Sequence, residues 1–462
     1  MKKRIVCLLL SIASLLAICS CSCIRSEVKY DYDLSEYLSI PDYKNKVYDI
    51  KEDEIKSAIA AYLMEYSKEY KVLRGDKVQV DIKFYELVDP EVDAKGAEIT
   101  ELFQDDLWVE RVATPDKDGN YQISSQIEEV IRGAKIGATI SNLFTLKDDF
   151  FVEKYRGKRL FVDVTVNNRI CEAGDVLTAS YTGYYIDSNG AIIKEGDKEK
   201  TFDTSENSPF YVGSHLAIDE FEEGLIGMKL GEEKNIYATF PATYEPEPDL
   251  AGKKVLFKVK IKNYFSPPVY NDDFVKTYFN SFNTTTEFEA SLKKELTLNL
   301  VYKYINDNTQ IFEFPSAEYD ATEEQLIEIA DTFKQQYSVT LEEYVRKQYN
   351  MTIDQYIKSN MKTEMIFYYL RDLIGEKAIP TETELAAMKE DIINDYKKSY
   401  MSNDGLTESQ AIAKANEYVE ALGDTYVYEQ VMYTKLDSII PTLVKTNLIK
   451  SEKDYIFDTK TE

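Results

Sequence analysis

Histidine is nearly absent from this chain, which has His215 as its single imidazole in 462 residues. A Ser-His-Asp or Cys-His catalytic arrangement would have to use that residue, and no nucleophile-elbow pattern accompanies it. A zinc protease needs more than one histidine ligand. Carboxylates are plentiful, but no pattern pairs two of them as acid and base. We therefore expect no hydrolytic site, no metal site and no cofactor, and we place His215 in a surface loop before a short helix.

Cysteine is also scarce, and four of the five cysteines lie within the first 23 residues. This segment starts with basic residues, continues with an apolar run over residues 5–18 and ends in small residues, a pattern typical of an export signal. Its end is similar to a bacterial lipobox, in which the cysteine after a small residue is lipidated. Cys21 fits best because Ser20 precedes it, and the alternatives are Cys19 and Cys23. A plain secreted protein is the other interpretation.

If Cys21 begins the mature chain, only Cys23 and Cys171 stay as free thiols, so no disulfide framework is expected. No second apolar run approaches the length of a transmembrane helix. The sequence thus predicts an extracytoplasmic protein that its N-terminal lipid holds at the bacterial cell membrane.

Basic residues are outnumbered by acidic ones, 55 to 82, and the net charge is −27. A surface with this charge repels phosphate backbones. Nucleic acid is therefore not an expected partner.

Five short motifs occur in a fixed order in the middle of the chain. They lie at residues 174–184, 201–204, 209–213, 218–232 and 251–260. Together and in this order they are similar to an FKBP-type peptidyl-prolyl isomerase domain. The resemblance implies an antiparallel half-barrel with an aromatic pocket, which rotates Xaa-Pro bonds and needs no cofactor.

The resemblance also assigns roles to residues. Phe221 would form the pocket floor, and Tyr181 and Asp203 its polar edge, and we take these three as catalytic. The substrate-binding positions would be Phe202, Phe210, Ala217, Ile218, Tyr244 and Phe257. The amide of Ile218 would hold a substrate carbonyl. Ala217 is smaller than the residue often found there, and the loop around Tyr244 departs from the common FKBP loop. The other interpretation is that these aromatic residues fill the core.

The same pattern occurs once before. Residues 127–137 precede 221–231 by 94 positions, and residues 156–165 precede 251–260 by 95, which indicates an internal duplication. The first copy lacks the aromatic positions, because Ile82 stands where Tyr181 is and Ile127 where Phe221 is. We interpret it as a degenerate, non-catalytic copy.

The prolines at 267 and 268 end the last strand, and long helical patterns follow. Four threonines each precede Glu or Gln by three residues, the pattern of a capping box, at Thr340, Thr352, Thr381 and Thr407. The loop at 240–244 and the motifs at 269–276, 314–316, 340–344 and 379–385 occur in the order found in trigger factor, so the chain is similar to that family over residues 44–395. The Gly-Phe-Arg-x-Gly-Lys signature by which that family docks on the ribosome is not found, so no ribosome is expected as a partner.

We therefore predict an α+β protein with two FKBP-like antiparallel half-barrels, the first degenerate, and an all-α chaperone domain of trigger-factor or SurA type. The predicted boundaries are a lipoprotein signal at 1–20, a polar tether at 21–43, and domains at 44–170, 171–266 and 267–462. The predicted function is peptidyl-prolyl isomerase and chaperone for unfolded or proline-containing exported polypeptides. The alternatives are an inactive holdase and a surface lipoprotein that binds a ligand.

Overall fold

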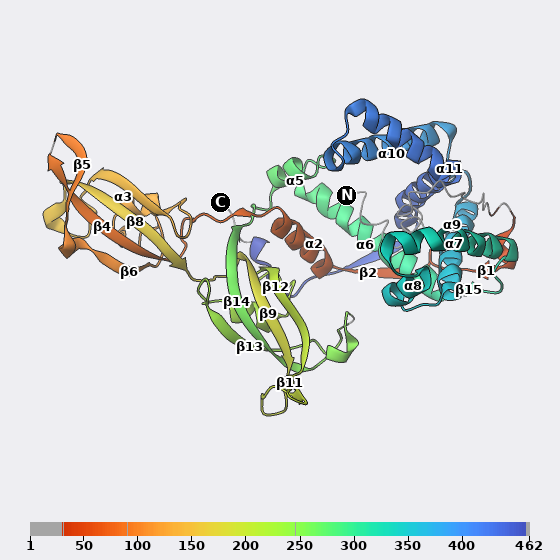
Figure 1. Ribbon diagram of the computed structural model, residues 1–462, viewed down its shortest axis with the longest axis horizontal. Helices are drawn as coiled ribbons and strands as arrows, with labels where there is room; N and C mark the ends of the chain where they lie inside the picture. Colours follow the sequence, from red (N-terminus) through yellow and green to blue (C-terminus); the bar gives the residue numbers. More distant parts are fainter. Residues whose placement is uncertain (1–29, 31, 90, 245, 459–462) are drawn as a thin grey trace. The chain divides into compact units, whose positions relative to one another are not determined.

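The computed structural model describes residues 30, 32–89, 91–244 and 246–458 (Figure 1). The chain forms two compact units. One contains residues 51–292 and 450–462, and the other contains residues 1–50 and 293–449. Each unit therefore combines segments that are far apart in the sequence.

The first unit holds two antiparallel sheets. In the first of these, the strand order is β5-β4-β8-β7, with β6 also paired to β4. The strands are β4 (Val78–Asp89), β5 (Val92–Glu98), β6 (Gln104–Val109), β7 (Thr139–Thr145) and β8 (Arg159–Arg169), and the short helix α3 (Ser125–Ile131) accompanies them. Alternate residues of β4 are buried, from Val78 to Phe84, as a half-buried strand requires.

The second sheet has the order β12-β9-β14-β13, and β3 pairs with the end of β14. The strands are β3 (Lys68–Glu69), β9 (Val176–Tyr185), β12 (Thr201–Tyr211), β13 (Glu233–Thr239) and β14 (Lys254–Ser266), with α4 (Asp219–Leu225). Figure 1 shows the four main strands as a curled sheet, and the hairpin of β10 (Lys194–Glu195) and β11 (Lys198–Glu199) lies near its tip. The strand β14 ends at Ser266, where the prolines predicted its end.

Corresponding residues of the two sheets have corresponding cross-strand partners. Tyr181 of β9 lies opposite Val259 of β14, and Ile82 of β4 lies opposite Val164 of β8. The residue pairs thus agree with the alignment predicted from the sequence. Each sheet also packs one short helix that carries a buried glutamate.

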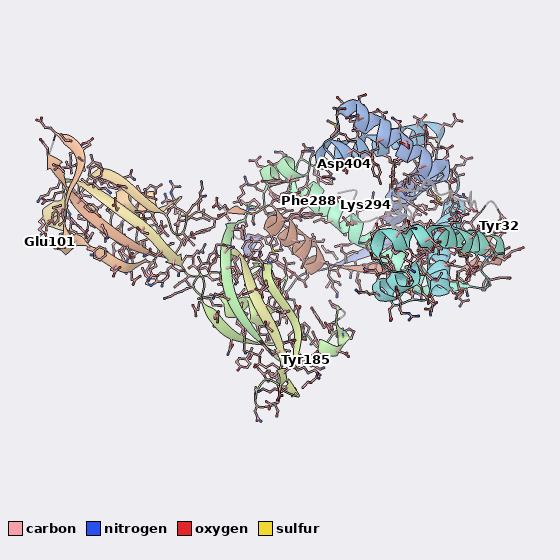
Figure 2. The ribbon with its side chains drawn as sticks, viewed as in Figure 1. Tyr32, Glu101, Tyr185, Phe288, Lys294 and Asp404 are labelled. Atoms are coloured by element: carbon pink, nitrogen blue, oxygen red, sulfur yellow. The ribbon has the colours of Figure 1, made fainter. Side chains whose placement is uncertain are left out.

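Helices complete this unit. They are α2 (Glu52–Glu65), α5 (Asp272–Tyr278) and the first turns of α6 (Thr285–Asn308). Ile55, Ile59 and Leu63 are buried and form the apolar face of α2. Tyr62 meets Phe288, labelled in Figure 2, with ring centroids 5.7 Å apart.

The other unit is mainly helical. It contains most of α6, then α7 (Ser316–Tyr337), α8 (Leu341–Tyr349), α9 (Ile353–Ile374), α10 (Glu382–Asn403) and α11 (Glu408–Ile439), which is kinked at Gly423. All four predicted capping boxes are present, at the starts of α8, α9, α10 and α11. Two short pairings, β1 (Leu38–Ser39) with β15 (Gln310–Ile311) and β2 (Val47–Lys51) with β16 (Lys445–Ile449), join segments distant in sequence. The predicted α+β class with a helical C-terminal region is confirmed.

The prediction of a polar tether is wrong over its described part. Tyr30, Leu34, Leu38 and Tyr43 are buried and belong to a core cluster with residues of α6, α9 and α11. Tyr32, labelled in Figure 2, donates a hydrogen bond to Glu318 Oε1 at 2.7 Å. This packing could not be predicted from the sequence, because charged residues alternate irregularly with the apolar ones and the segment shows neither helical nor strand periodicity. The other domain boundaries stay predictions.

Candidate functional site

Aromatic side chains gather on the inner face of the second sheet, against α4. Phe221 of α4 lies at the centre, with ring centroids 4.9 Å from Phe210 of β12 and 4.9 Å from Phe257 of β14. Tyr181 of β9 stands 6.0 to 6.2 Å from all three rings. Phe221 and Phe257 are buried, whereas Tyr181, Phe202 and Phe210 are half-buried. The structure thus brings the predicted floor and walls together, with part of the aromatic surface open.

Glycine at position 183 allows Phe202 to join this cluster. A Cβ built on Gly183 would lie 2.4 Å from Cζ of Phe202, which is closer than van der Waals contact permits. The Phe202 ring lies instead directly over the bare backbone of β9, 5.5 Å from Phe257. A side chain at 183 would therefore displace one wall of the cluster.

Tyr181 and Asp203 form a polar edge beside the rings. The Tyr181 hydroxyl donates a 2.5 Å hydrogen bond to Asp203 Oδ2. Burial, followed by the hydrogen bond and the charge of Asp203, raises the pKa of Tyr181 to about 12. The hydroxyl therefore stays protonated at neutral pH and acts as a donor.

The loop before α4, residues 213–218, is held from its inner side by Glu222. One carboxylate oxygen of Glu222 accepts the backbone N–H groups of Gly213 and His215, at 2.8 and 3.1 Å. The other accepts the N–H of Ala217 at 2.8 Å. Burial raises the pKa of Glu222, although these three hydrogen bonds oppose the shift. The buried carboxylate thus fixes the backbone of the loop.

In this arrangement the backbone amide of Ile218 is available to donate a hydrogen bond to a bound molecule. Ile218 is the N-cap residue of α4, and its carbonyl accepts from Phe221 and Glu222. Among the described residues, no hydrogen bond is donated by its amide. Ala217 and Ile218 both pack at the edge of the aromatic cluster. The geometry therefore suits the predicted role of this amide as a donor to a bound carbonyl.

Two further aromatic residues extend the cluster and were missed by sequence reasoning. Tyr185, labelled in Figure 2 at the end of β9, lies 5.4 Å from Phe202, and Phe240 lies 5.7 Å from Phe202. Tyr185 has the strand spacing that places it on the same face as Tyr181, which is the signal that could have found it. The Tyr244 ring lies tilted against Phe240, with centroids 4.8 Å apart, and so reaches the cluster through that ring.

Glu222 was also missed, and its signal was present in the repeat. Glu128 of α3 precedes it by 94 positions, is likewise buried and accepts from the backbone N–H groups of Ile123 and Ala113. A buried acid at the same place in both copies indicates a shared structural task.

His215 differs from the surface residue that was predicted. Its backbone has φ of 59°, and its side chain is 21% exposed. Both ring nitrogens face oxygen atoms, those of Asp219 and Asp454. A second segment of chain therefore covers this histidine.

Comparison with known proteins identifies the class of this domain. The family model of the FKBP-type peptidyl-prolyl cis-trans isomerases matches residues 167–262, which contain β9, β12, β13, α4, most of β14 and the aromatic cluster. That region is thus an FKBP-type domain.

The particular relatives are trigger factors. The trigger factor of Lachnoclostridium phytofermentans is 34% identical over 196 residues, which are 39% of this chain and 42% of that protein. The trigger factor of Agathobacter rectalis is 34% identical over 175 residues, which are 37% of each chain. The chain thus spans about two fifths of the curated relatives it matches. A solved trigger factor chaperone is 16% identical and has a TM-score of 0.19, with 65% of this chain and 79% of that chain covered, a score that carries no weight for the fold.

Proposed function

We propose that this protein is a peptidyl-prolyl cis-trans isomerase and folding chaperone, with catalysis in the aromatic site of the second sheet. The observation that carries the proposal is the cluster of Tyr181, Phe210, Phe221 and Phe257 inside a region that matches the FKBP-type family. The trigger factor relatives support the chaperone part.

The chemistry needs no acid, base or metal. The barrier to rotation of a peptide bond, about 18–20 kcal/mol, arises from its partial double-bond character. A pocket of aromatic rings removes water from the prolyl carbonyl and so favours the twisted bond, in which charge separation is smaller. In this site the rings of Phe221 and Phe257 receive the proline. The amide of Ile218 and the hydroxyl of Tyr181 orient the neighbouring polar groups.

We assign no catalysis to the first sheet. Phe84 of β4 lies opposite Val162, as Gly183 of β9 lies opposite Phe257. Phe84 is fully buried against Phe150, with centroids 5.6 Å apart. A phenylalanine of the strand itself thus stands where the second sheet has Gly183 beneath the Phe202 ring, which favours our interpretation of this domain as a degenerate FKBP-like copy.

The helical unit supplies apolar surface for unfolded polypeptides. Phe312 is 60% exposed and Ile327 of α7 is 68% exposed, and Leu373 of α9 is also exposed. Contiguous exposed apolar surface is typical of sites that bind other chains, and these three side chains are among the exposed apolar residues of this unit. The same observation favours the second candidate function, a holdase without isomerase activity.

The clients in this proposal are exported polypeptides, met outside the cytoplasm and away from the ribosome. The signal pattern of residues 1–20 supports this, and with it lipidation at Cys21, although these residues lie outside the described part of the chain. Among the described residues, no helix is long and apolar enough to cross a membrane. A lipid on the N-terminus is the anchor that we propose.

The test is a prolyl-isomerase assay on proline tetrapeptides, with Phe221→Ala beside Ile127→Ala. The two positions correspond in the two copies and both side chains are buried. Loss of turnover in Phe221→Ala alone would support catalysis in the second sheet. Absence of turnover in the wild-type protein on peptides and on a proline-limited refolding protein would refute the isomerase and leave the holdase.

A further inference from the structure

The segment of residues 451–458 packs on the FKBP-type domain, beside the loop that carries Ile218. The amide of Ile456 donates to the carbonyl of Gly213 at 3.4 Å, and a Cβ on Gly213 would lie 3.5 Å from Cβ of Ile456. Tyr455 and Phe457 are only 2% and 6% exposed. The segment therefore forms a packed layer over the outer side of the loop.

Polar contacts fix the segment at its start. The Tyr455 hydroxyl donates to Asp53 Oδ1 of α2 at 3.1 Å, and the amide of Ser451 donates to Glu52 Oε2 at 3.0 Å. Beyond them, the Phe457 ring meets the Tyr211 ring at the end of β12, 6.3 Å apart. The segment thus connects α2 to the beginning of the loop.

His215 makes the central contact, and its two partners are both acceptors. Nδ1 lies 2.8 Å from Asp219 Oδ1, and Nε2 lies 3.3 Å from the backbone carbonyl oxygen of Asp454. Neutral imidazole carries one N–H, whereas imidazolium carries two. Only the charged form can donate to both oxygens, so a neutral ring would leave a nitrogen lone pair facing an oxygen lone pair.

Charged side chains surround His215 and its loop. Asp219 also accepts from Lys453 Nζ at 3.1 Å, and Glu222 accepts from the His215 backbone. Burial opposes ionisation of Asp219, but the hydrogen bonds from His215 and Lys453 outweigh it and lower its pKa. The Tyr455 ring lies edge-on to the imidazole, with centroids 5.1 Å apart. Two acids and one lysine therefore face the imidazole and its loop.

We propose that segment 451–458 is a positioning element of the loop 213–218, and that the two ring contacts of His215 link the segment to the loop. The inference rests on the proposed isomerase function of the aromatic site. Glu222 holds the loop from inside and the segment holds it from outside, so both act on Ala217 and Ile218 without touching a substrate.

The decisive comparison is His215→Asn against Asp454→Ala. Asparagine tolerates positive φ but lacks the second ring nitrogen. Asp454→Ala keeps the backbone carbonyl that His215 contacts, so it is the matched control. We expect His215→Asn to lower kcat/KM on a proline tetrapeptide by about threefold or more, because the loop loses its hydrogen bond to the segment. Asp454→Ala should keep the wild-type value.

Hydrogen exchange measures the same contact without reference to activity. Protection factors of the amides of residues 213–217 and 455–457 should be lower in His215→Asn than in the wild type, and Asp454→Ala should match the wild type. Equal protection and equal kcat/KM in wild type and His215→Asn would overturn the proposal. If the wild type turns over no proline substrate, the proposed function fails, and the exchange result alone decides whether His215 holds the segment.

Discussion

Glu222→Gln is the perturbation whose consequences the structure defines most closely. The carboxylate uses one oxygen for Gly213 and His215 and the other for Ala217. Glutamine offers one oxygen and one NH₂ group, so at least one of these N–H groups loses its acceptor and faces a donor. Because Glu222 is 3% exposed, water does not replace the lost partner. We expect the domain to lose about 1–3 kcal/mol of stability, the cost of a buried unsatisfied donor.

The pH dependence of this loss has a defined sign. Burial raises the pKa of Glu222 above that of the unfolded chain. A group with a raised pKa contributes stability at low pH that is lost as the pH rises through its folded value. Glutamine has no such titration, so the difference between wild type and Glu222→Gln should be largest in acid and smaller near neutral pH. Unfolding in urea at several pH values, followed by hydrogen exchange of β9 and β14, measures it.

Glu128→Gln is the control for this prediction. Glu128 accepts from two backbone N–H groups in the first sheet, and burial raises its pKa in the same direction. Its loss of stability is readily followed because Trp108 of β6, the single tryptophan of the chain, belongs to that sheet. Glu222→Gln should lower kcat/KM on proline tetrapeptides and Glu128→Gln should not. The reasoning is refuted if Glu222→Gln keeps full turnover and full protection of residues 213–217, or if both variants lose turnover equally.

Three other substitutions test separate parts of the molecule. Gly183→Ala places a Cβ 2.4 Å from the Phe202 ring. It should cost about 1–3 kcal/mol of stability, measured by thermal unfolding, and should lower kcat/KM in the peptide assay. Wild-type stability together with wild-type kcat/KM would contradict the role of Phe202 as a wall of the site. Tyr181→Phe removes the hydroxyl that donates to Asp203. It should lower kcat/KM by about threefold to tenfold with little change in stability. An unaltered kcat/KM would exclude the hydroxyl from the mechanism. Thr381→Ala removes the cap of α10 and should cost about 1 kcal/mol in the helical unit, measured by urea unfolding, without effect on peptide turnover.

Local patterns predicted much of this fold. The capping boxes at Thr340 and Thr407 depend on residues three positions apart, and the strand alternation from Val78 to Phe84 depends on neighbours, so both could be found without tertiary information. The aromatic residues of the site followed from the family resemblance, and the structure places Tyr181, Phe210, Phe221 and Phe257 together.

Features that depend on distant partners could not be predicted. Arg169 is buried between the rings of Tyr70 and Tyr264, each 4.5 Å from its guanidinium carbon, and pairs with Asp175 at 2.6 Å. Nothing beside it in the sequence distinguishes it from a surface arginine. The packing of Tyr30 was missed for the same reason, because its partner Tyr368 lies more than three hundred residues away.

The discontinuity of both units has a consequence for biosynthesis. The strand β2 ends at Lys51, but its partner β16 begins only at Lys445, and the loop before α4 meets Tyr455 and Ile456 only near the end of the chain. Closing such long loops is entropically costly and slows folding. A growing or translocating chain would thus form its sheets early and remain incomplete until residues 445–458 arrive. The helical unit and the loop 213–218 would then be completed together, once those residues have been synthesised.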